Sequence, residues 1–415
     1  MQQPPHLGPG RPSASDGAKK VPQKCSPHPD RPRILVLSFS QIRRDPRVLR
    51  QIDLFRQFAE VVSCGYGEAP AGVVEHVQIP DVLKAWRKSF KTTQMLLVMR
   101  FYNKLYFDSE RIEFVRRLIP AGSVDVVVAN DAIAVPLALA LRPTLGVHAD
   151  LHEYAPRQGE DRLKWRLLFG PQMHWATRKF VTRVDSATTV AKGIAEEYAR
   201  VYRMPEPLVV PNASSYDDRY SPTIVQNPLR LIHTGAAGRG RKIEVMIDAV
   251  ARANELRPGM ATMDLVMVPG EQKYIDELAA RAESVPNGAV RMVPPVPFEQ
   301  IVPLLRNYDI GIFICPPSTF NLLHALPNKL FEFVQARLAV VIGPSPEMER
   351  VVRKYDFGVI SDGFDAESVA RLLTSLTPEA VAAMKLASHQ AARELSAEAV
   401  VSPWEDAVRK LVGAA

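Results

Sequence analysis

Short runs that are almost wholly apolar alternate with longer segments of helical periodicity along the first half of the chain. Runs of this kind are typical of strands that a parallel sheet buries on both faces. The segments are RILVLSFS, EVVSCGY, VDVVVAND, VHADLHE, SATTVAKGIAEEYARVY, which runs from a strand into a helix, and PLVVPNAS, which closes this half. An amphipathic helix over residues 46–58 is expected after the first strand. The alternation predicts a doubly wound parallel sheet.

The same alternation restarts in the second half of the chain. Further strands are predicted in LRLIHTG, MDLVMVPG, VRMVPPV, DIGIFICPP and LAVVIGP, with a helix over residues 243–254 after the first. The intervening segment SSYDDRYSPTIVQNP is polar and contains proline, as expected of a hinge. We therefore predict two similar α/β domains, residues 32–220 and 228–385, that face each other across a cleft. Ligands of such sheets bind outside the carboxyl ends of the strands.

The two ends of the chain differ from these domains. Residues 1–31 are rich in proline, glycine and serine and lack the apolar core of a signal peptide, so a disordered tail is expected. Residues 386–415 end in a helix with the sequence SPWEDAVRKLVGAA, in which Ser402 and Pro403 form a start signal. We assign residues 386–415 to helices that follow the second domain.

Composition limits the class of protein. At 415 residues the chain exceeds one typical core, and an apolar fraction of 47% excludes wholesale disorder. The formal net charge of +7 favours anionic partners. Three widely spaced cysteines, Cys25, Cys64 and Cys315, form neither a disulfide framework nor a zinc site. The most apolar stretch, residues 124–141, is interrupted by polar residues and proline, so it is not a membrane span. These features predict a cytoplasmic protein.

The segment HTGAAGRGRKIE has the features of a phosphate-binding loop. Gly235 follows a predicted strand, and Arg239, Arg241 and Lys242 precede a predicted helix. Small residues let backbone N–H groups approach a phosphate, and the start of a helix attracts it. The spacing is not that of a Walker loop. A solvated basic turn would have the same composition.

The segment ALPNKLFEF predicts the start of a helix that faces an anion. Asn328, Lys329 and Leu330 form its first turn, where a lysine opposes the helix dipole unless an anion is near. Glu332 lies three residues after Lys329, so both side chains can address the same side of the helix. A carboxylate there can accept hydrogen bonds from a ribose, and Lys329 can neutralise a diphosphate. A glutamate that only complements the dipole is the alternative, but it leaves Lys329 unexplained.

His152 and Glu153, in the segment ADLHEYAP, directly follow an apolar strand at the edge where the cleft is expected. A histidine at that edge can donate to a sugar hydroxyl or relay a proton. A half-buried histidine with satisfied hydrogen bonds is the alternative. No second histidine or cysteine lies at metal-ligand spacing, so no metal site is predicted.

Two basic segments indicate contact surfaces. In residues 82–106, Lys84, Arg87, Lys88 and Lys91 share one face of a predicted helix, and apolar residues occupy another. A contact with the inner face of a membrane or with a lipid-linked acceptor fits this pattern, as does a solvated helix packed on the core. The segment SQIRRDPRV lacks the interleaved aromatic residues of a nucleic-acid surface, so no nucleic-acid partner is expected.

Taken in order, these motifs resemble those of the family-4 retaining glycosyltransferases. The motifs are DPRVLRQIDLF, DLHE, VVPN, HTGAAGRGRKIEVMIDA, ALPNKLFEFVQARLAVV and SPWEDAVRKL, and the likeness extends from Arg33 to the C-terminus. It implies the GT-B architecture, two Rossmann-like domains facing a central cleft, with the last helix crossing back to the N-terminal domain.

The resemblance also implies roles for individual residues. Glu332 matches the second glutamate of the E-x7-E motif and would hold the ribose, whereas His324 stands where that motif has its first glutamate. Arg241 and Lys242 fall where a basic residue grips the diphosphate, and His152 falls where a histidine reaches the donor sugar. Many members have an arginine in place of Ala236, a role that Arg239 would take over here.

The implied reaction moves a sugar from a nucleotide-sugar donor to the hydroxyl of an unidentified acceptor, with retention and without a metal or another cofactor. His152, Glu153, Arg241 and Lys242 are the expected catalytic residues. Gly235, Arg239, His324, Asn328, Lys329, Leu330 and Glu332 are the expected donor contacts. His324 keeps open a catalytically silent protein that binds a nucleotide or a partner transferase. A nucleotide-sugar 2-epimerase shares the architecture, but the PNKLFEF and VVPN segments argue against it.

Overall fold

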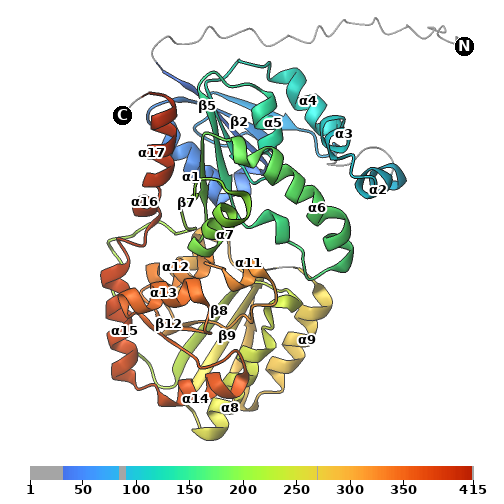
Figure 1. Cartoon of the computed structure of the whole chain (residues 1–415). Helices are drawn as coiled ribbons and strands as arrows, with labels where there is room; N and C mark the ends of the chain where they lie inside the picture. Colours follow the sequence, from blue (N-terminus) through green and yellow to red (C-terminus); the bar gives the residue numbers. More distant parts are fainter. Residues whose placement is uncertain (1–30, 84–89, 269, 414–415) are drawn as a thin grey trace, which may run out of the picture. The chain divides into compact units, whose positions relative to one another are not determined.

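The computed structural model describes residues 31–83, 90–268 and 270–413. The predicted tail, apart from Arg31, lies outside the described residues, as do Lys84, Arg87 and Lys88 of the basic segment. Residues 32–415 form one compact unit that contains two sheets (Figure 1).

The first sheet is parallel throughout, with the order β3-β2-β1-β4-β5-β6-β7 among the described residues. Its strands are β1 (Arg33–Gln41), β2 (Glu60–Tyr66), β3 (Glu75–Ile79), β4 (Val126–Asn130), β5 (Gly146–Leu151), β6 (Ser186–Thr189) and β7 (Leu208–Val209). The helices of this N-terminal domain are α1 (Pro46–Phe55), α2 (Phe90–Val98), α3 (Tyr102–Phe107), α4 (Glu110–Leu118), α5 (Val135–Ala140), α6 (Leu163–Lys179) and α7 (Lys192–Tyr202).

The second sheet is also parallel, and its order in the described chain is β10-β9-β8-β11-β12-β13. Its strands are β8 (Leu229–Ala236), β9 (Ala261–Val268), β10 (Val290–Val293), β11 (Ile310–Phe313), β12 (Ala339–Ile342) and β13 (Gly358–Ile360). The helices of this C-terminal domain are α8 (Glu244–Leu256), α9 (Gln272–Glu283), α10 (Ile301–Leu305), α11 (Phe320–Leu323), α12 (Asn328–Gln335), α13 (Pro346–Tyr355), α14 (Ala366–Ser375) and α15 (Pro378–Ala391).

The apolar runs form the central strands because these strands have a core on both of their faces. In β1, Leu35 and Leu37 point into one apolar cluster, whereas Ile34 and Val36 point into the other. The second sheet likewise separates two clusters, with Leu231 on one side and Ile232 on the other. The predicted doubly wound α/β class is confirmed.

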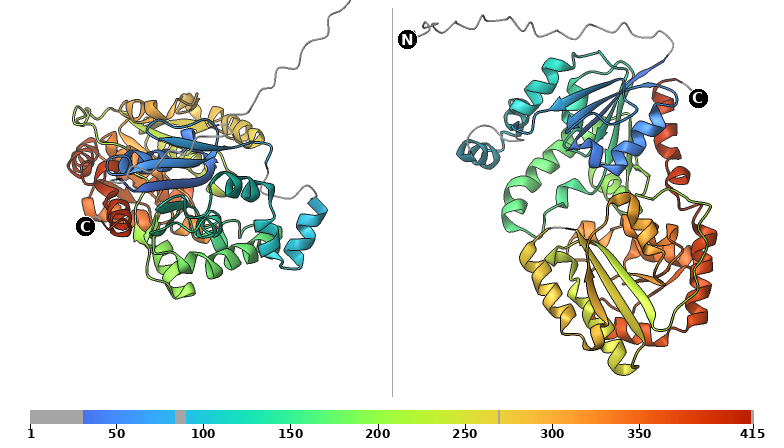
Figure 2. Two further views of the ribbon diagram at one scale, coloured as in Figure 1. Left: turned by 90° about the horizontal axis from the view of Figure 1, so that it is seen from above. Right: turned by 180° about the vertical axis from the view of Figure 1, so that it is seen from behind.

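The chain ends on the N-terminal domain. Helices α16 (Ala397–Val400) and α17 (Ser402–Leu411) lead from the C-terminal domain to α1, β5 and β6, as Figures 1 and 2 show. Trp404 of α17 is fully buried in the cluster that contains Val36.

The structure describes only part of the basic segment at residues 82–106, and that part forms two helices. Helix α2 ends at Val98, and α3 begins at Tyr102. Between them Arg100 adopts a left-handed conformation with φ 58°. Its N–H bonds to the carbonyl of Leu97, and the N–H of Phe101 bonds to that of Leu96, which is the pattern of a Schellman helix end.

Candidate functional site

Helix α12 begins at Asn328, and Lys329 in its first turn points inward. The Lys329 ammonium donates a 2.6 Å hydrogen bond to the carbonyl oxygen of Thr234, near the carboxyl end of β8. It also lies 4.5 Å from the ring centre of Phe313. Burial lowers the pKa of Lys329, and the Arg241 guanidinium lowers it further. Among the described residues this is the only hydrogen bond of the Lys329 ammonium, so its other N–H groups are available to an anionic ligand.

Gly235 makes room for the Lys329 ammonium. Its backbone has φ 139°, and a Cβ atom there would lie 2.6 Å from Lys329 Nζ. The Arg241 guanidinium lies 3.8 Å from the same point. The Arg241 guanidinium has no hydrogen-bond or ion-pair partner among the described residues. Gly235, Lys329 and Arg241 therefore form a positively charged corner at the end of β8.

The other two predicted cations of the loop have carboxylate neighbours instead. Arg239 donates to Glu271 at 2.8 Å and to both oxygens of Glu277 at 2.7 and 2.8 Å. The Lys242 side chain is 58% exposed, and its ammonium lies 4.0 Å from a Glu244 oxygen. Arg241 is thus the cation of this loop that stands beside Lys329.

Glu332 and Asn328 line a cavity of about 810 Å³ to which both domains contribute. The Glu332 side chain is only 5% exposed and has no hydrogen-bond or ion-pair partner within the described residues. Burial raises the pKa of Glu332, against the opposing effect of Lys329. Burying a carboxylate without a partner at a cavity wall costs free energy, and hydrogen bonds from a ligand would offset this cost. Glu332 is therefore a candidate acceptor for a ligand. Leu330, in contrast, is 2% exposed and packs in the core.

The cavity has an apolar end that the sequence motifs did not indicate. Phe298, just after β10, is 48% exposed at its wall, next to Ile301 and Val302. The other walls come from α1, the segment before it and the chain between the domains, and include Arg44, Leu49, Arg50, Asn212, Tyr216 and Tyr220. An aromatic side chain near an unpaired carboxylate suits a ligand with one flat apolar part and one part rich in hydroxyls.

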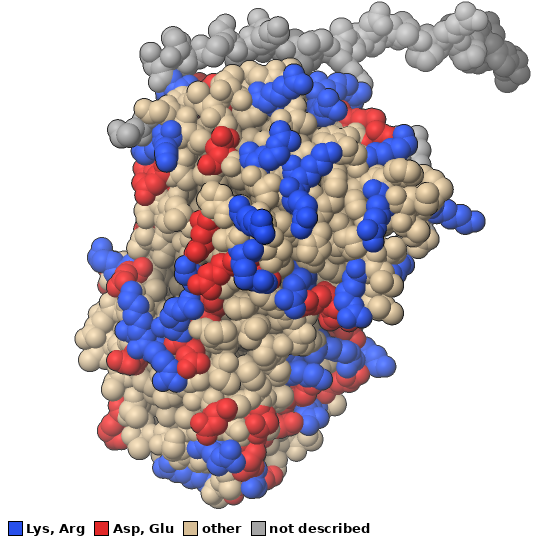
Figure 3. Space-filling model, in the orientation of Figure 1, with Lys and Arg blue, Asp and Glu red and all other residues tan. Residues whose placement is uncertain are grey.

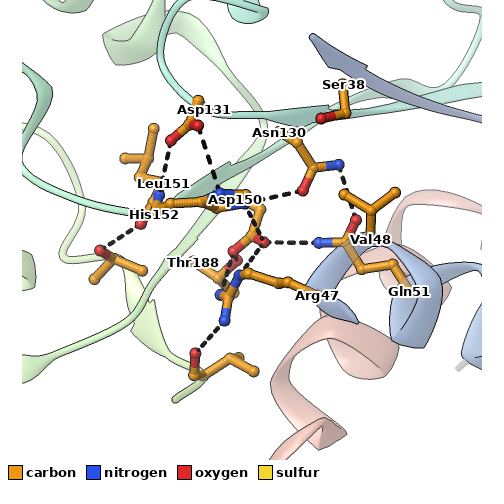
Figure 4. Close-up of polar contacts among 12 residues, drawn as sticks. Ser38, Arg47, Val48, Gln51, Asn130, Asp131, Asp150, Leu151, His152 and Thr188 are labelled. Atoms are coloured by element: carbon orange, nitrogen blue, oxygen red, sulfur yellow. Dashed lines mark hydrogen bonds and ion pairs between the residues drawn. The ribbon is translucent and has the colours of Figure 1, made fainter. Parts of the chain in front are cut away.

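His152 lies at the carboxyl end of β5 between two carboxylates (Figure 4). Its Nδ1 is 3.5 Å from an Asp131 oxygen, and its Nε2 is 3.4 Å from an Asp150 oxygen and 3.1 Å from Asn130 Oδ1. Burial lowers the pKa of His152, but the Asp131 charge and the hydrogen bond to Asp150 outweigh it, so the pKa is raised. His152 is therefore held as a cationic hydrogen-bond donor over a wider pH range.

Asp150 is fully buried and carries most of this network. Arg47 donates to both of its oxygens at 2.7 Å. Gln51 and Thr188 also donate at 2.7 Å, and the Trp404 indole of α17 donates at 3.3 Å. Burial raises the pKa of Asp150, but Arg47 and His152 reverse this and hold it well below the usual range.

The sequence motifs identified His152 but not the residues that orient it. Arg47 stands on the buried face of α1, and a charge inside an apolar stripe is a usable signal. Asn130 is the last residue of β4, Asp131 follows it as His152 follows β5, and these two strands are paired neighbours. Asp131 has φ 68°, an uncommon conformation for a residue other than glycine. Adjacency of strand ends could have revealed this group.

Glu153 lies against the C-terminal domain. One of its oxygens accepts from Asn321 of α11 at 3.3 Å, and Gln158 donates to the other. Burial and the Asp131 charge raise the pKa of Glu153 to about 7. At neutral pH the Glu153 carboxyl group is therefore poised between its two protonation states.

The raised pKa of Glu153 should make unfolding depend on pH. Its contribution to stability is fully present below the ordinary pKa of 4.5 and is lost as the pH rises through about 7. The urea midpoint of the wild type should therefore fall between about pH 5 and about pH 8 by more than that of Glu153→Gln. Glu283→Gln, an exposed site on α9, is the matched control and should follow the wild type. Equal pH dependence of Glu153→Gln and wild type would contradict this assignment.

His324 takes part in a contact between the domains. Its Nδ1 lies 3.4 Å from a Glu347 oxygen, and the ring occupies the space where a Cβ atom on Gly193 would be. Glu347 in turn accepts from the backbone N–H groups of Lys192 and Gly193 at 3.3 and 2.8 Å, at the start of α7. Glu347 is thus a carboxylate of the C-terminal domain that caps a helix of the N-terminal domain.

The described residues contain no group of three or more His, Cys, Asp or Glu side chains that could hold a metal ion. None of their helices combines the length and the apolar composition that crossing a bilayer requires.

Comparisons with known proteins bear on the fold. Neither the protein-family models nor the curated proteins include a match to this chain. The trehalose-6-phosphate synthase of Burkholderia multivorans is 12% identical over 92% of this chain and 99% of its own, with a TM-score of 0.64. Anabaena HepE, crystallised with UDP and glucose, is 13% identical over 91% of this chain and 100% of its own, with a TM-score of 0.66.

A third similar structure is a glycosyltransferase of Rickettsia africae. It is 10% identical over 93% of this chain and 100% of its own, with a TM-score of 0.66. At such low identity these likenesses concern the fold alone. The chain has the GT-B architecture of two parallel-sheet domains, and this prediction is confirmed.

Proposed function

We propose that the chain is a glycosyltransferase that moves a sugar from a nucleoside-diphosphate sugar to an acceptor hydroxyl with retention of configuration. The observation that carries this proposal is Glu332, a buried carboxylate without a partner among the described residues, at the wall of a cavity between two GT-B domains. The presence of UDP and glucose in the similar HepE structure supports the same class of donor.

The donor would lie along the cavity with its base at the apolar end. Phe298 offers an exposed ring on which a base can stack. Glu332 accepts from the ribose hydroxyls, a charge-assisted hydrogen bond. The diphosphate lies at the corner formed by Gly235, Lys329 and Arg241, where two cations stand close to a backbone that has no side chain.

Transfer breaks the bond between the anomeric carbon and the diphosphate and forms a bond from that carbon to the acceptor oxygen. Negative charge collects on the leaving diphosphate, and Lys329 and Arg241 stabilise it without a divalent ion. The acceptor proton passes to a phosphate oxygen of the leaving group. His152, whose pKa is raised by Asp131 and Asp150, donates to a hydroxyl of the sugar and keeps it in position.

A thermal-shift screen with UDP, GDP, ADP and TDP tests the donor site. One nucleotide, at about 100 times its Kd, should raise the melting temperature by about 5–10 °C with or without magnesium. Glu332→Ala should weaken the binding of that nucleotide roughly 10- to 150-fold, the value of a hydrogen bond to a charged group. Glu283→Ala is the matched control and should bind like the wild type. Absence of a shift with every nucleotide would contradict the proposal.

A second candidate is a protein of the same fold that binds the nucleotide without catalysis. The observation that favours it is His324, which stands where the glycosyltransferase family that the motifs resemble has a glutamate. His324 contacts Glu347, which in turn accepts hydrogen bonds from the N-terminal domain. The two candidates differ in turnover. Release of free nucleotide from the matching nucleotide-sugar, measured on the full chain, would exclude the silent protein, whereas binding without release would favour it.

A further inference from the structure

Helix α2 has apolar residues on two sides and buries only one of them. Leu96 and Leu97 lie in an apolar cluster that also contains Tyr102 and Leu105 and packs against Leu168, Phe169 and Trp175 of α6. On the other side, Met95, Val98, Met99 and Phe101 are 56%, 66%, 58% and 54% exposed. Single exposed apolar residues are common, but four within seven consecutive positions form a patch that calls for a partner. We name these four residues the α2 surface.

The surroundings of the α2 surface are basic. Residues 90–107 include Lys91, Arg100 and Lys104 but no aspartate or glutamate. Lys104 pairs at 3.0 Å with Asp108, the first acid after this stretch. Lys179 of α6 adds another cation, since its ammonium donates to Asn103 at 3.2 Å. Figure 3 shows Lys and Arg side chains beside an uncharged surface in the region of α2 and α3.

We propose that the α2 surface docks on a membrane that contains anionic lipid. The four apolar side chains enter the interfacial layer of the bilayer, and Lys91 and Arg100 lie against the phosphates of the lipid head groups. The Schellman end of α2 holds Arg100 and Phe101 in one turn. A cation and an exposed aromatic ring therefore lie next to each other at the end of the helix. This inference does not rest on the proposed sugar transfer.

Charge favours a membrane over a second copy of the chain. A two-fold contact through the α2 surface would place Lys91 and Arg100 of one copy near the same residues of the other. The stretch has no acidic side chain that could neutralise them. An anionic bilayer can bury the apolar side chains in its interfacial layer and neutralise Lys91 and Arg100 with its phosphate groups.

Co-sedimentation of the full chain with vesicles tests the proposal. Binding should be strong with vesicles of phosphatidylcholine and about one-third phosphatidylglycerol, weak with phosphatidylcholine alone, and reduced by salt. The charge variant Lys91→Gln/Arg100→Asn should bind roughly thirtyfold more weakly, since each cation near an anionic surface contributes about a factor of five. Asparagine is chosen at position 100 because it tolerates the left-handed φ of 58° there.

A second variant tests the apolar part. Val98→Ser/Met99→Ser changes two exposed side chains, so the fold should persist while vesicle binding is lost. The matched control is Leu256→Ser/Leu386→Ser, which removes two exposed apolar side chains from the C-terminal domain and should bind vesicles like the wild type. All variants should keep the wild-type response to the nucleotide in the thermal-shift assay, which separates a failure of this proposal from a failure of the donor site.

Three results would overturn the proposal. The first is no binding of the wild type to anionic vesicles, and the second is an equal loss of binding in the control variant. The third is a concentration-dependent dimer in sedimentation velocity that Val98→Ser/Met99→Ser abolishes, without vesicle binding by the wild type. That outcome would assign the α2 surface to a second copy of the chain.

Discussion

Replacing Arg47 with alanine is expected to lower the free energy of unfolding by about 3–5 kcal/mol, as is typical when one partner of a buried ion pair is removed. Arg47 and Asp150 are 5% and 0% exposed, so the substitution leaves the Asp150 charge buried without its main partner. It also removes hydrogen bonds to Val210 and Asn212 and the contact of the guanidinium with the Trp404 ring. Urea-induced unfolding, followed by circular dichroism, measures the loss.

Two further variants identify the cause of that loss. The double substitution Arg47→Ala/Asp150→Ala removes the buried charge as well, so it should be less destabilising than the sum of the two single substitutions. Arg116→Ala, at an exposed position of α4, is the matched control and should change stability by less than about 0.5 kcal/mol. A loss below about 1 kcal/mol in Arg47→Ala would mean that the pair is hydrated and not buried.

Replacing Lys329 with methionine is expected to lower turnover by about 100- to 1000-fold, the range found when one preorganised donor to a developing anion is lost. Methionine has a similar length and fills the site beside Phe313, and it removes the charge that would stabilise the leaving diphosphate. The experiment uses the nucleotide-sugar whose nucleotide gives the largest thermal shift. Turnover is measured as the release of that nucleotide.

The matched control for this prediction is Lys242→Met. Lys242 belongs to the basic loop, but its side chain is 58% exposed and its ammonium lies beside Glu244. Its turnover should stay within a few-fold of the wild type. If Lys242→Met lost activity and Lys329→Met retained it, the diphosphate would lie along the outer part of the loop, and the assignment of the positively charged corner would be wrong.

Most of the strands could be predicted because they are runs of consecutive apolar residues. A strand such as β4, with the sequence VVVAN, is buried at every position and can be recognised without its neighbours. The strands that the prediction missed lie at the ends of the two sheets. β3, with the sequence EHVQI, has polar residues at three of its five positions, and β13 has only three residues. Neither contains the long apolar run that marks most of the other strands.

The predicted site residues lie in different surroundings, because their neighbours come from elements that are distant in sequence. Glu332 and Asn328 reach the cavity, and Lys329 and Arg241 meet at the end of β8. Arg239, close to Arg241 in the chain, pairs with two glutamates at α9, because its direction depends on where that helix packs. Charged residues that are close in sequence can therefore contact different parts of the structure.

The alternation of apolar runs and helical periods was sufficient to derive a two-domain parallel α/β chain, the start of α12 at Asn328 and a glycine loop after β8. These features depend on local backbone preference and on burial, which neighbouring residues encode. The hydrogen-bond network of Asp150 and His152 is different, because Asp150 lies 103 positions from Arg47 and 254 positions from Trp404. Their hydrogen bonds form only when α1, β5 and α17 pack together. The buried Asp150 carboxylate is then paired with Arg47, which is distant in sequence.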